Sequence, residues 1–325
     1  MAEEAETAPL QPTRSAVDWP ALRLQWRRWR RYWLRDPLLA LLNVAIHHGG
    51  RLLPTECGSG IGALLGRING RYRFRAPRET AERVYRSLLA GTTASEAHAA
   101  IQRLFANVGS VMVEFSRLDR LWREGRIAVT GSEPLLAVRA AGRPVIVMGL
   151  HLNNWEVIGP SLIGLGLGGF KFIYQPPPSR FDHRMAVAAR RRYGAIMLRP
   201  GVAAARIARR LLVDERGVLL IYADDERRGR IGAPLFGRPI PPRANLSTIV
   251  RLAWASGAAV IPAYAERTGG ARFQVNYLPP ADLLPAGGDP EACLAENIRR
   301  LDRLITPIVL AHLDQWYMLL EYRAA

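Results

Sequence analysis

The sequence is poor in lysine and cysteine. Lys171 is the only lysine, so arginine supplies nearly all of the cationic charge behind the formal net charge of +17 in 325 residues. Arginine forks suit phosphates, whether these belong to nucleic acid, lipid headgroups or a phosphorylated substrate, and charge alone does not distinguish the three. The two cysteines, Cys57 and Cys293, have neither the number nor the spacing of a disulfide framework or a zinc site. We therefore expect a reduced protein that faces the cytoplasm.

A long hydrophobic run and a signal peptide are also missing. The longest apolar run, residues 37–46, falls well short of the roughly 20 residues that span a bilayer, and two histidines follow it directly. Glutamates stand near the N-terminus where a signal peptide needs a basic region. We expect neither a spanning helix nor export by that route.

Motifs of several common enzyme classes are absent. The sequence has no GxSxG nucleophile elbow, no GxxxxGK[ST] phosphate loop and no HExxH zinc motif. A GxGxxG occurs at Gly164, Gly166 and Gly169, but it follows a predicted helix and precedes a predicted strand, whereas dinucleotide binding needs the reverse order. We therefore expect no cofactor and no metal.

Residues 19–35 carry an amphipathic helical pattern. Apolar and aromatic side chains recur at steps of three and four, and most of the arginines lie off this stripe. The pattern is typical of a helix in the headgroup region of an anionic membrane. Packing of the tryptophans on the protein's own core is the alternative, whereas nucleic-acid binding is not favoured, because no recognised nucleic-acid motif accompanies the segment. The stripe consists of Trp19, Leu22, Trp26, Trp29 and Trp33.

The rest of the chain divides into a helical part and an alternating part. Residues 51–68 are apolar segments interrupted by glycine, which we place near the membrane interface, and residues 75–121 predict two helices. After Gly142, short apolar runs alternate with helical stretches, which is typical of a mostly parallel sheet covered on both faces. We thus predict an N-terminal arm with membrane-interface helices over residues 1–70 and one α/β catalytic domain over 71–325. Expected strands are 144–150, 170–174, 195–198, 218–223, 259–264 and 273–278, and expected helices are 155–165, 181–193, 202–213, 244–256 and 290–313.

A histidine follows the first of these predicted strands. The strand ends at His151, and Glu156 falls in the first turn of the next helix, from which its carboxylate can return toward the imidazole. Ligands bind beyond the carboxyl ends of the strands in such sheets. A histidine oriented by a carboxylate can take a proton from a hydroxyl, which then attacks a thioester carbonyl. His151 and Glu156 are our catalytic candidates, and a helix-capping pair is the alternative.

Two further groups of residues are candidates for the site. Asp224 and Asp225 end an apolar strand, so at least one of them is expected to face the cleft. Arginines cluster around the predicted helix 181–193 and the strand end that follows, where they can bind acceptor phosphates or the phosphopantetheine arm of a donor; a solvated helix face is the alternative. These arginines are Arg180, Arg184, Arg190, Arg191, Arg192 and Arg199.

The residues around His151 resemble a known family. His151, Asn154, Trp155 and Glu156 are similar to the H-x4-D/E motif of glycerolipid acyltransferases, in the NWE form of the bacterial lauroyl/myristoyl acyltransferases that complete lipid A. Five more segments resemble that family in order and spacing, over nearly all of the chain after about Arg51. They are LLP with GxxLG at 52–66, GVLLIYADD at 217–225, PLFGRPIP at 234–241, ASGAAVIPAY at 255–264 and DQWYML at 314–319.

The resemblance implies a glycerolipid acyltransferase-like enzyme on the cytoplasmic face of the bacterial inner membrane. It implies acyl carrier protein or coenzyme A as the carrier of the acyl donor, and a site lined by Asp224 and by the arginine of an R-x-x-x-G stretch, best matched by Arg190. The expected acceptor is a hydroxyl of a lipid A precursor. The substrate-binding candidates are Asn154, Trp155, Arg190, Arg199, Asp224 and Asp225.

The chain departs from the family pattern at three places that concern the acceptor. Asp225 stands where the family has glutamine, Pro242 replaces the usual threonine after the segment 234–241, and the C-terminal histidine-arginine cluster common in lipid A enzymes is missing. A lysophospholipid, a lipoamino acid or another glycolipid are therefore alternative acceptors. From a different class of protein, a non-catalytic membrane-binding protein on the same scaffold is a further alternative.

Overall fold

A seven-stranded sheet forms the centre of the computed structural model, which describes residues 19–322 apart from 178, 228–229 and 242–243. The strand order is β1-β9-β8-β2-β5-β3-β4, and all neighbours pair in parallel except β8 and β9. The predicted α/β fold with a mostly parallel sheet is confirmed. The strands are β1 (Ile127–Thr130), β2 (Val145–Gly149), β3 (Lys171–Ile173), β4 (Ile196–Leu198), β5 (Val218–Tyr222), β8 (Ala259–Gly269) and β9 (Arg272–Tyr277), with a separate antiparallel pair of β6 (Glu226–Arg227) and β7 (Arg230–Ile231).

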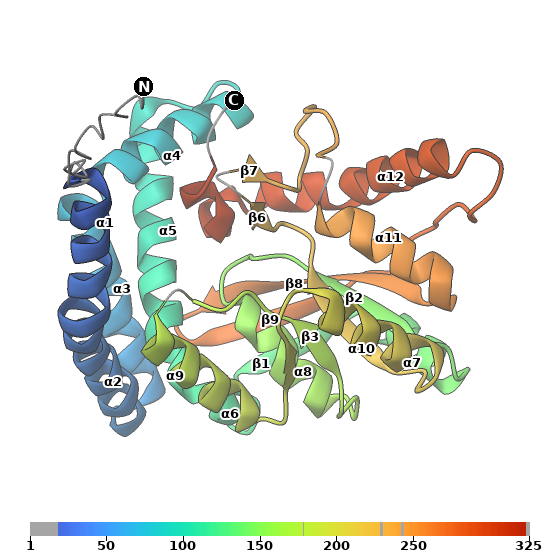
Figure 1. The fold of residues 1–325 in the computed structure, drawn as a ribbon, viewed down its shortest axis with the longest axis horizontal. Helices are drawn as coiled ribbons and strands as arrows, with labels where there is room; N and C mark the ends of the chain where they lie inside the picture. Colours follow the sequence, from blue (N-terminus) through green and yellow to red (C-terminus); the bar gives the residue numbers. More distant parts are fainter. Residues whose placement is uncertain (1–18, 178, 228–229, 242–243, 323–325) are drawn as a thin grey trace, which may run out of the picture.

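Helices cover both faces of the sheet, as expected (Figure 1). Successive side chains of β2 alternate between two cores: Val145 and Val147 pack with α6 to α9, whereas Ile146 and Met148 pack with α4, α5 and α10 to α12. This double burial explains why β2 has a continuous apolar sequence. The helices are α4 (Arg75–Leu88), α5 (Ala94–Glu114), α6 (Leu118–Leu121), α7 (Glu133–Ala140), α8 (Ile158–Gly164), α9 (Arg180–Arg191), α10 (Val202–Val213), α11 (Asn245–Ser256) and α12 (Pro290–Ala311).

Strand β1, helix α7 and the short β6–β7 pair are not among the predicted elements. β1 has only four residues, and its single neighbour is β9, with Ile127 aligned to Phe273. A partner so distant in the sequence leaves no local signal, because a strand is stabilised mainly by its cross-strand neighbours. The other predicted strands and helices agree with the structure in type and, except for the longer β8, to within a few residues.

The first three helices of the described chain lie along one side of the molecule, with α5 between them and the sheet (Figure 1). They are α1 (Trp19–Arg30), α2 (Asp36–Leu52) and α3 (Thr55–Tyr72), and a wider π-helical turn, Arg31–Arg35, joins the first two. Helix α3 crosses the predicted boundary at residue 70, since it ends at Tyr72, and it packs on α5 beyond that boundary, so the two predicted regions are in direct contact. The division into two domains stays a prediction.

Glycines set the distance between α3 and α5. A Cβ atom at Gly66 would lie 2.1 Å from the carbonyl oxygen of Phe105, and one at Gly109 would lie 2.1 Å from that of Gly62. Backbones that approach so closely admit only small residues, as in other small-xxx-small helix pairs. The glycine face of α3 is therefore its buried face, and the larger apolar side chains point outward. The outward residues are Ile61, Leu64, Leu65, Ile68 and Tyr72.

We expect Gly66→Ala to lower the free energy of unfolding by roughly 1–3 kcal/mol, because the added methyl group forces the two backbones apart. Gly60→Ala is the matched control on the same helix, since a Cβ atom there meets nothing within 4 Å. That control should be neutral or stabilising by up to about 1 kcal/mol, because alanine favours the helix. Denaturant unfolding of the two variants measures the difference, and equal effects would contradict the close approach of α3 and α5.

Candidate active site

The pairing of β2 with β5 brings His151 and Asp224 together. Gly149 is aligned with Tyr222, so the residues two positions further on emerge side by side at the carboxyl edge of the sheet. The backbone N–H of His151 donates to Asp224 Oδ2 at 2.8 Å, and the imidazole Nδ1 lies 2.9 Å from Asp224 Oδ1. Asp224 is fully buried, whereas the side chain of His151 is 18% exposed. The imidazole therefore reaches solvent, and the carboxylate behind it does not.

The donors around Asp224 define the tautomer of His151. Trp316 Nε1 donates to Asp224 Oδ2 at 2.8 Å, so this oxygen accepts from both an indole and a backbone N–H. A carboxylate with only N–H neighbours accepts at each contact, which assigns the proton of the neutral imidazole to Nδ1. His151 Nε2 then carries a lone pair and can act as a base.

Aromatic side chains enclose the imidazole. The ring centroid of Tyr222 lies 4.3 Å from that of His151, and the centroid of Trp155 lies at 5.2 Å. Gly149 permits this arrangement, because a Cβ atom there would lie 2.8 Å from the Tyr222 ring. Tyr222 donates its hydroxyl to the Trp155 carbonyl oxygen at 2.9 Å, and burial raises its pKa well above the ordinary value. Tyr222 thus stays protonated and fixes the main chain beside His151.

The carboxylate on His151 is not the one that we predicted. Glu156 accepts from Arg190 through both of its oxygens, with Nε at 3.0 Å and Nη2 at 2.6 Å. The carboxylate that contacts the His151 imidazole is Asp224. Burial alone lowers the pKa of the Arg190 guanidinium, but Glu156 more than compensates, and the net pKa is raised. The expectation that Glu156 orients His151 is therefore corrected. The physical reason is that a bidentate ion pair with arginine satisfies a buried carboxylate better than one imidazole N–H does.

Aromatic rings hold Arg190 in this buried position. Its guanidinium lies over the rings of Phe115, Phe172 and Tyr174 at 5.1, 5.4 and 4.6 Å from their centroids. Such stacking stabilises a cation that has left water. The Glu156–Arg190 pair thus ties the start of the helical segment after His151 to α9.

The other predicted substrate-binding residues lie in different surroundings. Trp155 contacts His151, but Asn154 is fully buried and its amide donates to Glu114 Oε2 at 2.9 Å. Asp225 accepts from the backbone N–H of Asn245 at 3.1 Å, at the start of α11. Arg199 is exposed after β4, which β5 and β3 separate from β2, so that its strand lies roughly 14 Å from that of His151. Of the six predicted residues, Trp155 and Asp224 contact His151.

The remaining arginines of the predicted cluster do not converge on one point. Arg180 lies over the Tyr32 ring at 3.8 Å from its centroid, and Arg192 Nη1 lies 3.4 Å from His47 Nε2. Arg184 and Arg191 are exposed on α9. The alternative of a solvated helix face therefore describes Arg184 and Arg191, and Arg190 alone among the six is buried in an ion pair with Glu156.

Sequence reasoning did not single out Trp316, Tyr222 and Tyr317 as parts of the site. Tyr317 contributes its backbone N–H to the carbonyl oxygen of His151 at 2.9 Å, and its ring lies 5.0 Å from that of Trp155. Trp316 and Tyr317 stand in the DQWYML segment and Tyr222 in GVLLIYADD, and both segments resemble the acyltransferase family. That resemblance was the available signal, although it did not indicate which residues meet His151.

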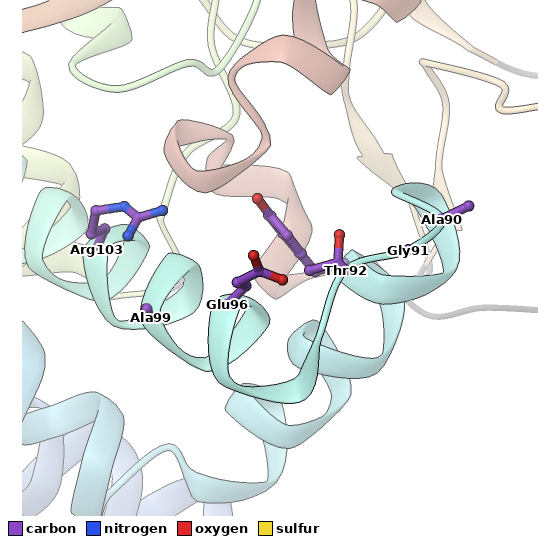
Figure 2. A pocket seen from close by; sticks show the side chains of 7 residues that line it. Ala90, Gly91, Thr92, Glu96, Ala99 and Arg103 are labelled. Atoms are coloured by element: carbon purple, nitrogen blue, oxygen red, sulfur yellow. The ribbon is translucent and has the colours of Figure 1, made fainter.

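Other possible sites do not compete with this one. Among residues 19–322, with the gaps given above, no group of three or more His, Cys, Asp or Glu is placed to hold a metal ion. A hollow of about 480 Å³ lies at the turn between α4 and α5, and Figure 2 shows side chains that line it. Its charged side chains are already engaged, because Glu96 forms a capping box with Thr93 and Arg103 pairs with Asp314. We assign no ligand to it.

The fold and the site define an α/β protein with a histidine paired to a buried acid at the carboxyl edge of a mostly parallel sheet. The sequence model of the bacterial lipid A biosynthesis acyltransferases matches residues 27–322, nearly the whole chain. The chain belongs to this family, which confirms the resemblance, and it is an acyltransferase of lipid A biosynthesis. A comparison with curated proteins found no match.

We expect Glu156→Gln to act mainly on stability, because it leaves the buried Arg190 guanidinium without its counter-charge. Loss of one partner of a buried ion pair costs roughly 3–5 kcal/mol, which denaturant unfolding can measure. The double variant Glu156→Gln with Arg190→Gln should recover part of this loss. If the free energy of unfolding is unchanged while activity is lost, Glu156 would instead act on His151, as the sequence predicted.

Proposed function

We propose that this acyltransferase moves a fatty acyl group from a thioester of acyl carrier protein or coenzyme A to a hydroxyl of a lipid A precursor, with His151 as the general base. The contact between His151 Nδ1 and the buried Asp224 carboxylate carries the proposal. It supports an imidazole whose free nitrogen, Nε2, accepts a proton. In this proposal Asp224, rather than Glu156, orients the imidazole.

The reaction follows from these groups. The acceptor hydroxyl gives its proton to Nε2 while its oxygen attacks the thioester carbonyl carbon. The carbon–sulfur bond then breaks, the new ester forms, and the leaving thiolate takes the proton back from the imidazolium. Asp224 stabilises the imidazolium between the two steps, because no other charge lies as close to the ring among the contacts of the described residues. The protein needs no covalent acyl intermediate in this scheme.

We expect His151→Ala and Asp224→Asn to lower kcat on the order of 100-fold or more, because one removes the base and the other removes the charge that stabilises its protonated form. Turnover of a radiolabelled acyl donor, supplied as acyl carrier protein or as coenzyme A thioester, measures the effect and identifies the donor. His98→Ala is the control, since His98 is an exposed histidine on α5 that pairs with Glu82.

The acceptor is tested in cells by mass spectrometry of lipids from strains with the native gene or with His151→Ala. Loss of one acyl chain from lipid A supports the proposed acceptor. An unchanged lipid A with a chain missing from a lysophospholipid, a lipoamino acid or another glycolipid would move the acceptor to that class. If His151→Ala turns over substrate at the native rate, the proposed mechanism is wrong.

We also propose that α1 to α3 lie on the cytoplasmic face of the inner membrane. No helix in the described part of the chain is long and apolar enough to cross a bilayer. Trp26, Trp29 and Trp33 are nevertheless exposed, so these three do not pack on the protein core; the side chains of Trp19 and Leu22 lie outside the described set. The outward face of α3 adds a second apolar surface. Exposed aromatic and leucine side chains beside arginines are suited to the headgroup region of an anionic bilayer.

We expect Leu64→Ser with Ile68→Ser on α3 to weaken binding to anionic liposomes on the order of tenfold, because each change removes apolar area that the bilayer would bury. Deletion of residues 1–35 should weaken binding as well, and more strongly at low salt, where the arginines attract the lipid. Leu304→Ser is the control, since Leu304 is an exposed leucine on α12, away from α3 in Figure 1. Equal binding of the α3 variant and the control in a flotation assay would contradict the proposed surface.

A further inference from the structure

A second buried ion pair lies next to the turn that follows His151. Glu114, at the end of α5, is 1% exposed, and its two oxygens accept from Arg267 of β8 at 2.7 and 3.0 Å. The Arg267 guanidinium also lies over the ring of Phe273, 4.9 Å from its centroid. The carboxylate of Glu114 is thus held in one orientation by a bidentate contact.

A hydrogen bond with Asn154 connects Glu114 to the turn that follows His151. The Asn154 amide donates to Glu114 Oε2 at 2.9 Å, and Asn154 stands three residues after His151 and directly before Trp155. On the other side of the turn, Asn153 donates its backbone N–H and its amide to Gln315, at 2.8 and 2.9 Å. The turn is therefore held from two sides, by Glu114 and by the C-terminal segment.

Asn153 adopts a conformation that needs such support. Its φ angle of 43° lies in the left-handed region, which asparagine tolerates better than most residues but which still costs energy. The hydrogen bonds of Asn153 and Asn154 offset this cost. Loss of either set would free the turn to relax and would move the imidazole of His151 with it.

We infer that Glu114 and Arg267 are positioning residues for acyl transfer, acting through Asn154. The inference rests on the proposed function of His151. A buried ion pair is seldom the most stabilising way to join two elements, since apolar side chains of similar volume often do as well or better. A carboxylate oxygen held in place by Arg267, however, sets the direction of the Asn154 amide through a hydrogen bond. Apolar packing would not set that direction. A displacement of about 1 Å at a reacting group can lower turnover on the order of 100-fold.

The first test removes the hydrogen bond between Asn154 and Glu114 and leaves the ion pair of Glu114 with Arg267 intact. We expect Asn154→Ala to lower kcat at least tenfold, with KM for donor and acceptor within twofold and with a thermal unfolding midpoint that still gives folded enzyme at the assay temperature. Ser59→Ala is the matched control, because Ser59 donates to Glu114 Oε1 at 2.6 Å from α3 and does not contact the turn. The control should keep kcat within twofold. An unchanged kcat in Asn154→Ala, or a rise in KM in place of the fall in kcat, would overturn the positioning role.

A double-mutant cycle tests whether Glu114 and Asn154 act as one unit. Glu114→Met with Arg267→Met removes both charges together, so that neither is left buried without a partner. We expect this pair to lower kcat to about the level of Asn154→Ala, and Asn154→Ala in the same background to lower it no further, since coupled residues are not additive. Fully additive effects would show that Asn154 acts independently of Glu114 and would overturn the inference.

The same assay separates this inference from the proposed function. If the native enzyme and His151→Ala turn over equally, the proposed role of His151 fails. If they differ strongly while Asn154→Ala equals the native enzyme, the role of His151 stands and the positioning role fails.

Discussion

The parallel alignment of β2 with β5 places the two groups on which the site depends, His151 and Asp224. Because Gly149 is aligned with Tyr222, His151 and Asp224 leave the sheet at the same level and within hydrogen-bonding distance. The hydrogen bond from the His151 backbone N–H attaches the carboxylate to the strand end itself. Trp316 donates a third hydrogen bond to the Asp224 carboxylate, and this bond holds the C-terminal segment beside the site.

Charge balance explains why His151 pairs with one carboxylate out of three. Asp224, Glu156 and Glu114 all lie in or beside the turn that follows β2, and each is buried. Glu156 and Glu114 have arginine partners, Arg190 and Arg267, and form neutral pairs. Asp224 accepts from Trp316, from the His151 backbone and from the imidazole. Among the described residues no arginine or lysine pairs with it, so a positively charged imidazole is the cation that compensates its charge, which is what a general base needs.

Sequence patterns predicted the sheet well and the site in part. The sequences of β2 and β5 are continuously apolar, because their side chains are buried on both faces of the sheet. This pattern predicted buried parallel strands, and it predicted that His151 follows a strand at the carboxyl edge. The choice between Glu156 and Asp224 was beyond reach, because it depends on which strands are neighbours. A carboxylate five residues away looked closer than one that lies 73 positions along the chain and 2.9 Å away in space.

Helix α3 inverts the usual arrangement of a helix on a protein surface, in which the large apolar residues face the core. Small residues of α3 face the protein and large apolar residues face outward, because the backbone of α5 lies too close for side chains between them. In water this arrangement leaves apolar area exposed without a compensating gain in packing. In a bilayer interface the same area is buried, and close backbone contact remains a favourable way to join helices. The proposed contact with the membrane would therefore explain the glycine contact and the outward leucines together.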